Sequence, residues 1–140
     1  AILISFAMVA FTLSPKAAAF LDKNGSVTLR VTDSETDIPL KNVAFRLYFV
    51  ARAYESGNSI RYELIPPYDE SKIGIDDLQD ASLPIHLAYF AESRSLPYTE
   101  KSTDENGVLI FEDLTPGLYL IVPAQEIEGC YMRSRIRYSK

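Results

Sequence analysis

Few side chains in this sequence could carry out nucleophilic or metal chemistry. His86 is the only histidine and Cys130 the only cysteine. A Ser-His-Asp triad or a histidine-based zinc site would therefore have one imidazole to use. His86 flanks the apolar face of a predicted helix, so we expect a half-exposed structural residue. Cys130 alternates with core positions and has no basic or histidine residue directly beside it, which predicts a buried, inert thiol.

Two acidic clusters could hold a hard cation, but neither has the spacing of a calcium loop. Asp76, Asp77 and Asp80 lack the alternating 1, 3, 5 pattern, and helix capping explains them better. The stretch Asp104-Glu-Asn-Gly107 lacks the earlier aspartates and the later bidentate glutamate, so it predicts a turn. We therefore expect no metal, no cofactor and no catalytic residue.

Two further groups could bind ligands through charge or stacking. Arg133, Arg135 and Arg137 stand at strand spacing, which favours a solvated outer face with acidic neighbours over a site for a sulfated or phosphorylated ligand. Six tyrosines offer aromatic surface for sugar or protein, but the sequence does not indicate which of them cluster, so sheet packing is the simpler interpretation. They are Tyr48, Tyr54, Tyr62, Tyr68, Tyr89 and Tyr98.

The composition is that of a single globular domain with a core. The chain has 140 residues, of which 47% are hydrophobic and 24% charged, and its formal net charge is −5. This acidity argues against nucleic acid and anionic lipid as partners. A single cysteine excludes a disulfide within the chain, so stability must come from the core.

Residues 1–19 are typical of the end of a secretory signal peptide. An apolar run of about 13 residues, short of the roughly 20 that span a bilayer, is followed by Ser14-Pro-Lys16 and the small residues Ala17-Ala-Ala19. An uncleaved anchor or a buried terminal helix is the alternative. We expect the sequence to begin inside its reading frame, a mature domain over residues 20–140, and truncation at Lys140.

The elements that must position these residues are mainly strands. Period-two alternation predicts strands near residues 25–32, 43–50, 60–64 and 130–138, with one wet face to the sheet. The stretch Thr103–Val122 adds two turns and two short strands, 108–112 and 118–122. Leu83, Leu87, Phe90 and Ala91 fall on one helical face, which predicts a helix over about residues 76–94, broken or kinked near 81–84. The chain is thus predicted to be all-β with a helical insertion.

Six segments, in order, resemble a known family. They are Gly25-Ser-Val-Thr-Leu-Arg-Val-Thr-Asp33, Ser34-Glu-Thr-Asp-Ile-Pro-Leu40, Val43-Ala-Phe-Arg-Leu-Tyr48, Thr103-Asp-Glu-Asn-Gly107, Phe111-Glu-Asp-Leu114 and Pro116-Gly-Leu-Tyr119. The pattern is similar to the SpaA-type, Cna protein B-type prealbumin-like domain of Gram-positive pilins and adhesins. The resemblance, over about residues 25–136, implies a transthyretin-like (prealbumin-like, Ig-like) β-sandwich that serves as a stalk or display module on the cell wall.

Members of that family often contain an autocatalytic isopeptide bond, which requires a buried lysine amine, a carboxyl or amide acceptor and an assisting acid. The family's lysine would stand two residues before Asp33, where this chain has Val31. Pro123 occupies the usual glutamate position, with Glu126 and Glu128 farther on. We therefore expect no isopeptide bond, and ordinary surface roles for Lys41, Lys72 and Lys101.

These observations predict a secreted, non-enzymatic surface module, pilin-like or adhesive. Its partners would be other surface-protein domains, or a host or matrix protein or glycan, with a membrane link only through a downstream anchor. One alternative is a carbohydrate- or protein-binding accessory domain of an extracellular enzyme. Another is a 5-hydroxyisourate hydrolase on the transthyretin fold. That family relies on more than one histidine and a C-terminal Tyr-Arg-Gly-Ser, and this chain has neither.

Overall fold

The described part of the chain is built mainly from strands in two β-sheets. The computed structural model describes residues 7–10, 23–124 and 130–138, with the backbone alone at 7–10 and 130–138. The larger sheet has five strands in the order β1-β7-β3-β4, with β5 also paired to β3; the smaller has the order β6-β2-β8. The strands are β1 (Ala7–Ala10), β2 (Gly25–Asp33), β3 (Ala44–Ser56), β4 (Ser59–Leu64), β5 (Thr99–Ser102), β6 (Val108–Leu114), β7 (Gly117–Pro123) and β8 (Cys130–Tyr138).

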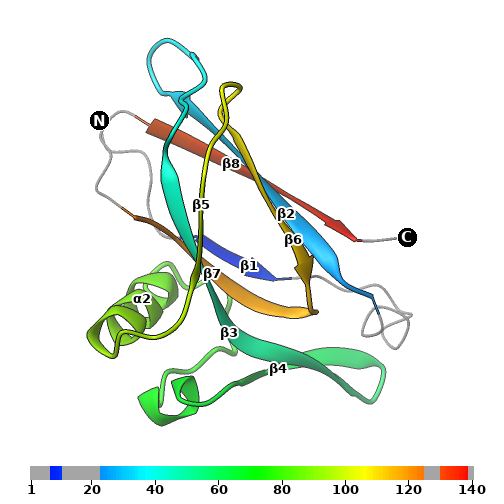
Figure 1. Cartoon of the computed structure of the whole chain (residues 1–140). Helices are drawn as coiled ribbons and strands as arrows, with labels where there is room; N and C mark the ends of the chain where they lie inside the picture. Colours follow the sequence, from blue (N-terminus) through cyan, green and yellow to red (C-terminus); the bar gives the residue numbers. More distant parts are fainter. Residues whose placement is uncertain (1–6, 11–22, 125–129, 139–140) are drawn as a thin grey trace.

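The two sheets face each other across a core to which both contribute (Figure 1). We call it the sandwich core. Val27, Leu29 and Val31 of β2 alternate into it as their spacing predicts, and each is completely buried. The remaining buried members come from β3, β6 and β7: Phe45, Leu47, Leu109, Phe111, Tyr119 and Ile121. The prediction of an all-β protein with two packed sheets is confirmed at this level.

A second core lies on the opposite face of the larger sheet, where α2 (Leu83–Ser93) and the short 3₁₀ helix η1 (Tyr68–Ser71) cover β3 and β7. We call it the helix-side core. Its buried members are Tyr48, Val50, Tyr68, Leu83, Leu87, Ala88, Ala91, Leu96, Leu120 and Val122. The predicted wet outer face is therefore wrong for this sheet: Tyr48 is 1% exposed because the helical layer covers it.

The apolar composition of β7 reflects its position between the two cores. Tyr119 and Ile121 enter the sandwich core, while Leu120 and Val122 enter the helix-side core. A strand buried on both faces is selected for an unbroken apolar run rather than for alternation. The run from Leu118 to Val122 is therefore the signature of the middle layer.

Several element boundaries differ from those predicted. The helix covers Leu83–Ser93 rather than 76–94, because residues 76–82 form turns and bends; it begins at the predicted break, with Pro84 in its first turn. Strand β3 continues to Ser56, beyond the predicted end near residue 50. Strand β5 was not predicted, because all four of its side chains are exposed and give no apolar period.

Both chain ends take part in the sheets. Within the predicted leader, β1 pairs antiparallel with β7, from Ala7 opposite Ile121 to Ala10 opposite Leu118. Strand β8 pairs with β2, which places Met132 opposite Val31 and Cys130 opposite Asp33. The predicted burial of Cys130 and the predicted stripe of Arg133, Arg135 and Arg137 concern side chains outside those described. No helix of the described residues is long and apolar enough to cross a membrane.

Candidate functional site

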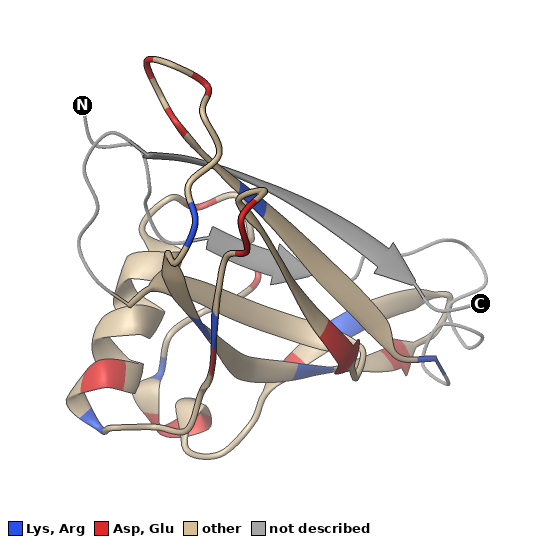
Figure 2. Cartoon of the chain, turned by 45° about the horizontal axis from the view of Figure 1, so that its top comes forward, with Lys and Arg blue, Asp and Glu red and all other residues tan. Residues whose placement is uncertain are grey.

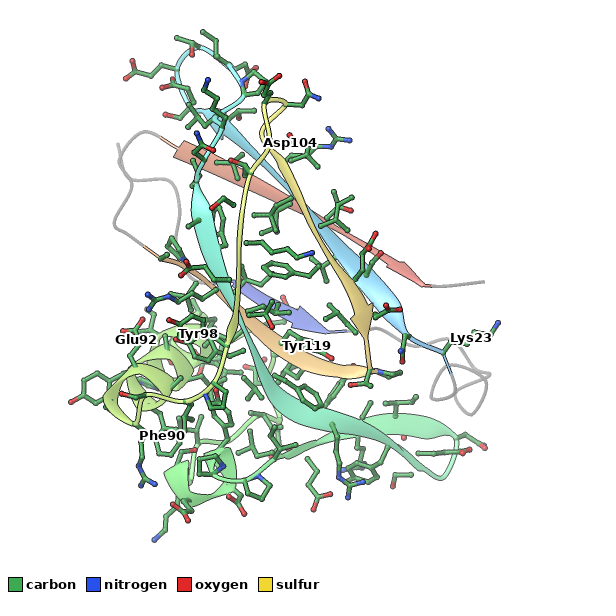
Figure 3. The ribbon with its side chains drawn as sticks, viewed as in Figure 1. Lys23, Phe90, Glu92, Tyr98, Asp104 and Tyr119 are labelled. Carbon is green, nitrogen blue, oxygen red and sulfur yellow. The ribbon has the colours of Figure 1, made fainter. Side chains whose placement is uncertain are left out.

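A cleft of about 340 Å³ lies where the segment entering β5 and the end of β6 meet β3 and β7. We call it the aromatic cleft. Its lining residues come from β3, from the segment entering β5, from the end of β6 with the following turn, and from β7. They are Leu47, Phe49, Pro97, Tyr98, Thr99, Asp113, Leu114, Thr115 and Tyr119. Figure 3 shows Tyr98 and Tyr119 on these different segments.

Two irregularities in strand pairing, one in each sheet, lie at this cleft. In β6, three steps from Phe111 to Leu114 are opposed by two steps in β2, so the strand carries an extra residue. In β3, two steps from Phe49 to Ala51 are opposed by one step in β7. Bulges bend a strand and re-aim its side chains, and they are common beside binding sites. Both sheets therefore depart from regular pairing at the same place.

Stacked rings form the floor of the cleft. The Phe49 and Tyr119 rings are 5.0 Å apart at an interplanar angle of 24°. The Tyr119 hydroxyl donates to the backbone carbonyl of Thr115 at 2.6 Å, which fixes the ring and satisfies its polar end. Burial raises the pKa of Tyr119, and the hydrogen bond with Thr115 opposes part of that shift. Tyr119 is thus neutral at physiological pH and fixed in the sandwich core, with only 3% of its surface exposed.

Gly117 makes room for this floor. A Cβ at Gly117 would lie 2.6 Å from Cε1 of Phe49 and 2.4 Å from the Ala51 carbonyl oxygen. Positive φ in this region occurs at Gly107 and Asp113 and not at Gly117. The reason for glycine at position 117 is therefore close packing against the bulge of β3.

Tyr98 lines the cleft at the entry to β5 and is 46% exposed. The guanidinium of Arg46 lies 4.5 Å from its ring centroid, and Arg46 Nε donates to Glu100 Oε1 at 3.0 Å. That pairing with Glu100 raises the pKa of Arg46. The Tyr48 ring, on the helix side, is 5.5 Å from Tyr98. Arg46 and Tyr48 alternate with Leu47 and Phe49 along β3, so the Tyr98 ring lies on the helix-side face of the larger sheet and not over the Phe49–Tyr119 pair.

Asp113 forms the opposite wall in an unusual backbone conformation. It is exposed and has a φ of 54°, in the left-handed region that aspartate tolerates better than most residues. Neither Asp113 nor its neighbour Glu112 forms an ion pair within the described residues. The cleft therefore combines an aromatic floor with an acidic, solvated rim.

A second hollow, of about 350 Å³, lies beside the β3–β4 hairpin. It brings together Tyr54, Tyr62 and Asp76, which the sequence had left unconnected, with Arg61 at its edge. Of the other predicted tyrosines, Tyr89 is 76% exposed on α2, while Tyr68 is buried against Phe90 with ring centroids 5.8 Å apart. The six candidate tyrosines thus divide between two hollows, a helix surface and a core.

The remaining candidate residues serve local structure. His86 is exposed on α2. Asp77 Oδ1 accepts from the Gln79 N–H, and Asp80 Oδ1 accepts from the N–H and hydroxyl of Ser82, which lowers the pKa of Asp80. Asp104 Oδ1 accepts from the N–H groups of Asn106 and Val108 and so forms the predicted turn. No cluster of three or more metal-ligand side chains occurs within the described residues.

Two positions at which the sequence departs from the family pattern, Val31 and Pro123, lie in the sheets. Val31 is completely buried in the sandwich core, and Pro123 ends β7. Glu126 and Glu128 lie outside the described residues. The described lysines, Lys23, Lys41, Lys72 and Lys101, are exposed, and Lys101 Nζ donates to the Ile110 carbonyl at 2.9 Å across the gap between β5 and β6.

The cleft was not found from the sequence, because its residues come from four separate segments. The only local signal was Asp113, a residue that tolerates positive φ, just before the turn Thr115-Pro-Gly117. Comparison with known proteins gave no match: no family model, no curated protein and no solved structure is significantly similar to this chain. Functional conclusions therefore depend on the geometry and on the resemblance of the quoted segments.

Proposed function

We propose that this chain is a non-enzymatic surface module, a pilin-like or adhesin stalk domain exported to a Gram-positive cell wall. The proposed fold is the transthyretin-like β-sandwich of SpaA-type and Cna protein B-type domains, with α2 as an insertion. The observation that carries the proposal is the core itself. Among the described residues the buried set is apolar except for Thr103, whose hydroxyl donates to the Leu40 carbonyl and accepts from the Val43 N–H.

A purely structural core suits a stalk. Catalytic groups are usually found in clefts, with pKa values shifted by burial and by specific charged partners. Here the carboxylates with shifted pKa values, Asp33 and Asp80, are exposed and hold turns together. Basic and acidic residues are interspersed along the described ribbon (Figure 2). Such a surface suits a soluble display domain.

The proposed module lacks the intramolecular isopeptide bond. The apolar Val31 fills the position at which the family's lysine would supply the amine, and it packs in the sandwich core. Intact mass of the folded chain tests this directly. A mass equal to that calculated from the sequence supports the proposal, whereas the loss of one ammonia or one water would restore the bond.

The surface role has its own test, which is to obtain the complete open reading frame. We expect further β domains, a sorting signal of the Leu-Pro-x-Thr-Gly kind, an apolar span and basic residues. A catalytic domain directly downstream with no anchor would instead favour the second candidate, a binding appendage of an extracellular enzyme. The aromatic cleft is the observation that favours that candidate.

A further inference from the structure

We propose that β1 covers an assembly edge, and that the exported chain, once its leader is removed, pairs this edge with the same edge of a second copy. The edge is the side of β7 that faces away from β3, and we call it the β7 edge. Strand β1 pairs with it antiparallel, from Ala7 opposite Ile121 to Ala10 opposite Leu118 (Figure 1). The inference rests on the proposed function, because it requires the predicted leader, residues 1–19, to be cleaved on export.

Strand β7 has the composition of an interior strand. Every described strand other than β1 and β7 contains charged residues. Natural proteins often place charges on edge strands, where they prevent pairing with another chain. The edge strands β4, β5 and β6 follow this rule, with Arg61 and Glu63, Glu100 and Lys101, and Glu112 and Asp113. Strand β7 has no such protection when β1 is absent.

Removal of the leader opens this edge. Strand β1 lies within the leader, so cleavage after Ala19 takes it away. The backbone groups of Leu118–Ile121 that pair with β1 then lose their partners. The side chains of these four residues are at most 3% exposed with β1 in place. Unpaired backbone groups beside buried apolar side chains cost free energy unless another strand replaces the lost one.

A second copy supplies the kind of strand that β1 shows this edge to accept. Strand β7 is itself extended and uncharged, and two identical edges related by a two-fold axis perpendicular to the sheet run antiparallel. Rotation about this axis keeps each face of the sheet on its own side, so residues of the same face lie opposite each other. With the axis at Leu120, the middle of β7, Tyr119 lies opposite Ile121 of the second copy and Leu118 lies opposite Val122. The two sheets then continue as one.

The test is the oligomeric state of the chain with and without β1, measured by sedimentation velocity in reducing buffer so that Cys130 cannot form a crosslink. The full chain, produced without export so that it keeps its leader, should be monomeric. The full chain with Met8→Pro and Val9→Pro should dimerise with a Kd on the order of 10 μM. Neighbouring N–H groups of a strand point to opposite sides, so the two prolines remove the one that faces β7. Ala17→Pro with Ala18→Pro adds the same prolines to the leader outside β1 and should leave the chain monomeric.

A second route removes β1 after folding. A protease site inserted after Ala19 allows the leader to be cut from the folded chain, which should then dimerise as the proline variant does. A synthetic peptide of residues 5–12 should dissociate this dimer, and the same peptide with Met8→Pro and Val9→Pro should not. Isotope-filtered NMR of mixed labelled and unlabelled copies should show contacts between copies at residues 118–122. The Kd should change less than about twofold with added salt, because the β7 edge is uncharged, whereas pairing through the charged β4 or β5 edge would depend on salt.

Three results would overturn the β7-edge dimer. The first is a folded chain without β1 that stays monomeric at about 200 μM; the cut chain decides this if the proline variant does not fold. The second is unfolding of the cut chain, which would make β1 an integral strand. The third is binding of the leader peptide at residues 118–122 with no dimer, which would mean that a different protein supplies the strand. Leader cleavage is tested separately by N-terminal sequencing of the secreted chain. A secreted chain that retains residues 7–10 would refute the export processing in the proposed function, while dimerisation of the proline variant would still establish the edge.

Discussion

The two faces of the larger sheet are covered by different kinds of partner. The sandwich core joins strands to strands, and the one tyrosine it contains among the described side chains, Tyr119, has its hydroxyl bound to the Thr115 carbonyl. The helix-side core joins strands to α2, η1 and loops, and it contains Tyr68, whose hydroxyl is buried with no hydrogen-bond partner within the described residues. A buried hydroxyl without a partner costs free energy. Among the described residues, the buried tyrosine hydroxyl of the sandwich core therefore has a hydrogen-bond partner, while that of Tyr68 in the helix-side core does not.

The two cores therefore have different structural roles. The sandwich core contains β2, β3, β6 and β7 and holds the floor of the aromatic cleft in place, since Phe49 packs against it and Tyr119 belongs to it. The helix-side core adds burial to the middle strands and closes the face that would otherwise expose Tyr48 and Val50. Breaking the first core should disturb the cleft and the fold together, whereas breaking the second should act first on the helix layer.

The largest effect should come from Phe45→Ala in the sandwich core. Phe45 is completely buried, so truncation leaves a cavity and should cost about 3–5 kcal/mol of unfolding free energy. Urea denaturation at neutral pH measures this loss. Tyr89→Ala is the control, since its side chain is 76% exposed, and it should change stability by less than about 0.5 kcal/mol. Equal losses in the two variants would contradict the assignment of this core.

Leu87→Ala should weaken the helix-side core by about 2–5 kcal/mol, because Leu87 is completely buried between α2 and the sheet. If the helix layer is the less tightly held one, amides of α2 should exchange with deuterium faster in this variant while those of β2 change little. Hydrogen exchange read by NMR gives both answers. Uniform acceleration in both elements would mean that the two cores open as one unit.

Gly117→Ala tests the link between the sandwich core and the cleft. The added methyl would lie 2.4 Å from the Ala51 carbonyl oxygen and 2.6 Å from the Phe49 ring. Something must shift, at a cost of about 1–3 kcal/mol. We expect a lower melting temperature and altered NMR signals of Phe49 and Tyr119. Unchanged aromatic signals would show that Gly117 does not position the cleft floor.

Two tyrosine-to-phenylalanine variants should have opposite signs. Tyr119→Phe removes a hydroxyl that donates to Thr115 and should cost about 1 kcal/mol. Tyr68→Phe removes a hydroxyl that is buried without a partner in the described structure, so it should be neutral or stabilising by up to about 1 kcal/mol. Chemical denaturation of both variants against the parent measures the pair. A loss of stability in Tyr68→Phe would show that its hydroxyl is satisfied.

The contrast between the two cores also explains which of them could be predicted from the sequence. The sandwich core follows from alternation, since Val27, Leu29 and Val31 each lie where period two places them. The helix-side core does not, because a strand residue such as Tyr48 has the same local pattern whether water or a helix covers its face. Only the docking of α2, a contact between segments distant in the chain, decides between the two.

The cleft was harder to predict than either core. Its formation depends on two bulges, and a bulge is a property of the register between strands rather than of one segment. Strand β5 has exposed side chains throughout, so it left no apolar period to detect. The individual residues Tyr98 and Asp113 were visible, as an aromatic candidate and as part of a motif, but nothing local brought them together.

The smallest effects on stability should appear only at acidic pH. They concern two turns, one beside each core. Asp33, at the end of β2, accepts from the N–H groups of Glu35 and Thr36, and these bonds lower its pKa below the ordinary value of 3.8. Asp80, ahead of α2, is lowered by its bonds from Ser82. A folded-state pKa below the unfolded one means that the unfolded chain takes up protons first as the pH falls.

The stability that each carboxylate contributes is therefore fully present above about pH 4 and is lost as the pH falls through the folded-state pKa. Asp33→Asn and Asp80→Asn should each flatten the decline in unfolding free energy between pH 6 and pH 2, measured by urea denaturation at fixed ionic strength. Asp69→Asn is a control, because Asp69 forms no such bond in the described structure. Because Asp80 holds only the entry to α2, Asp80→Asn should reduce the acid-induced loss of amide protection in α2 less than Asp33→Asn reduces it in β2. If neither variant changes the decline in unfolding free energy at acidic pH, other carboxylates must cause the acid sensitivity of the fold.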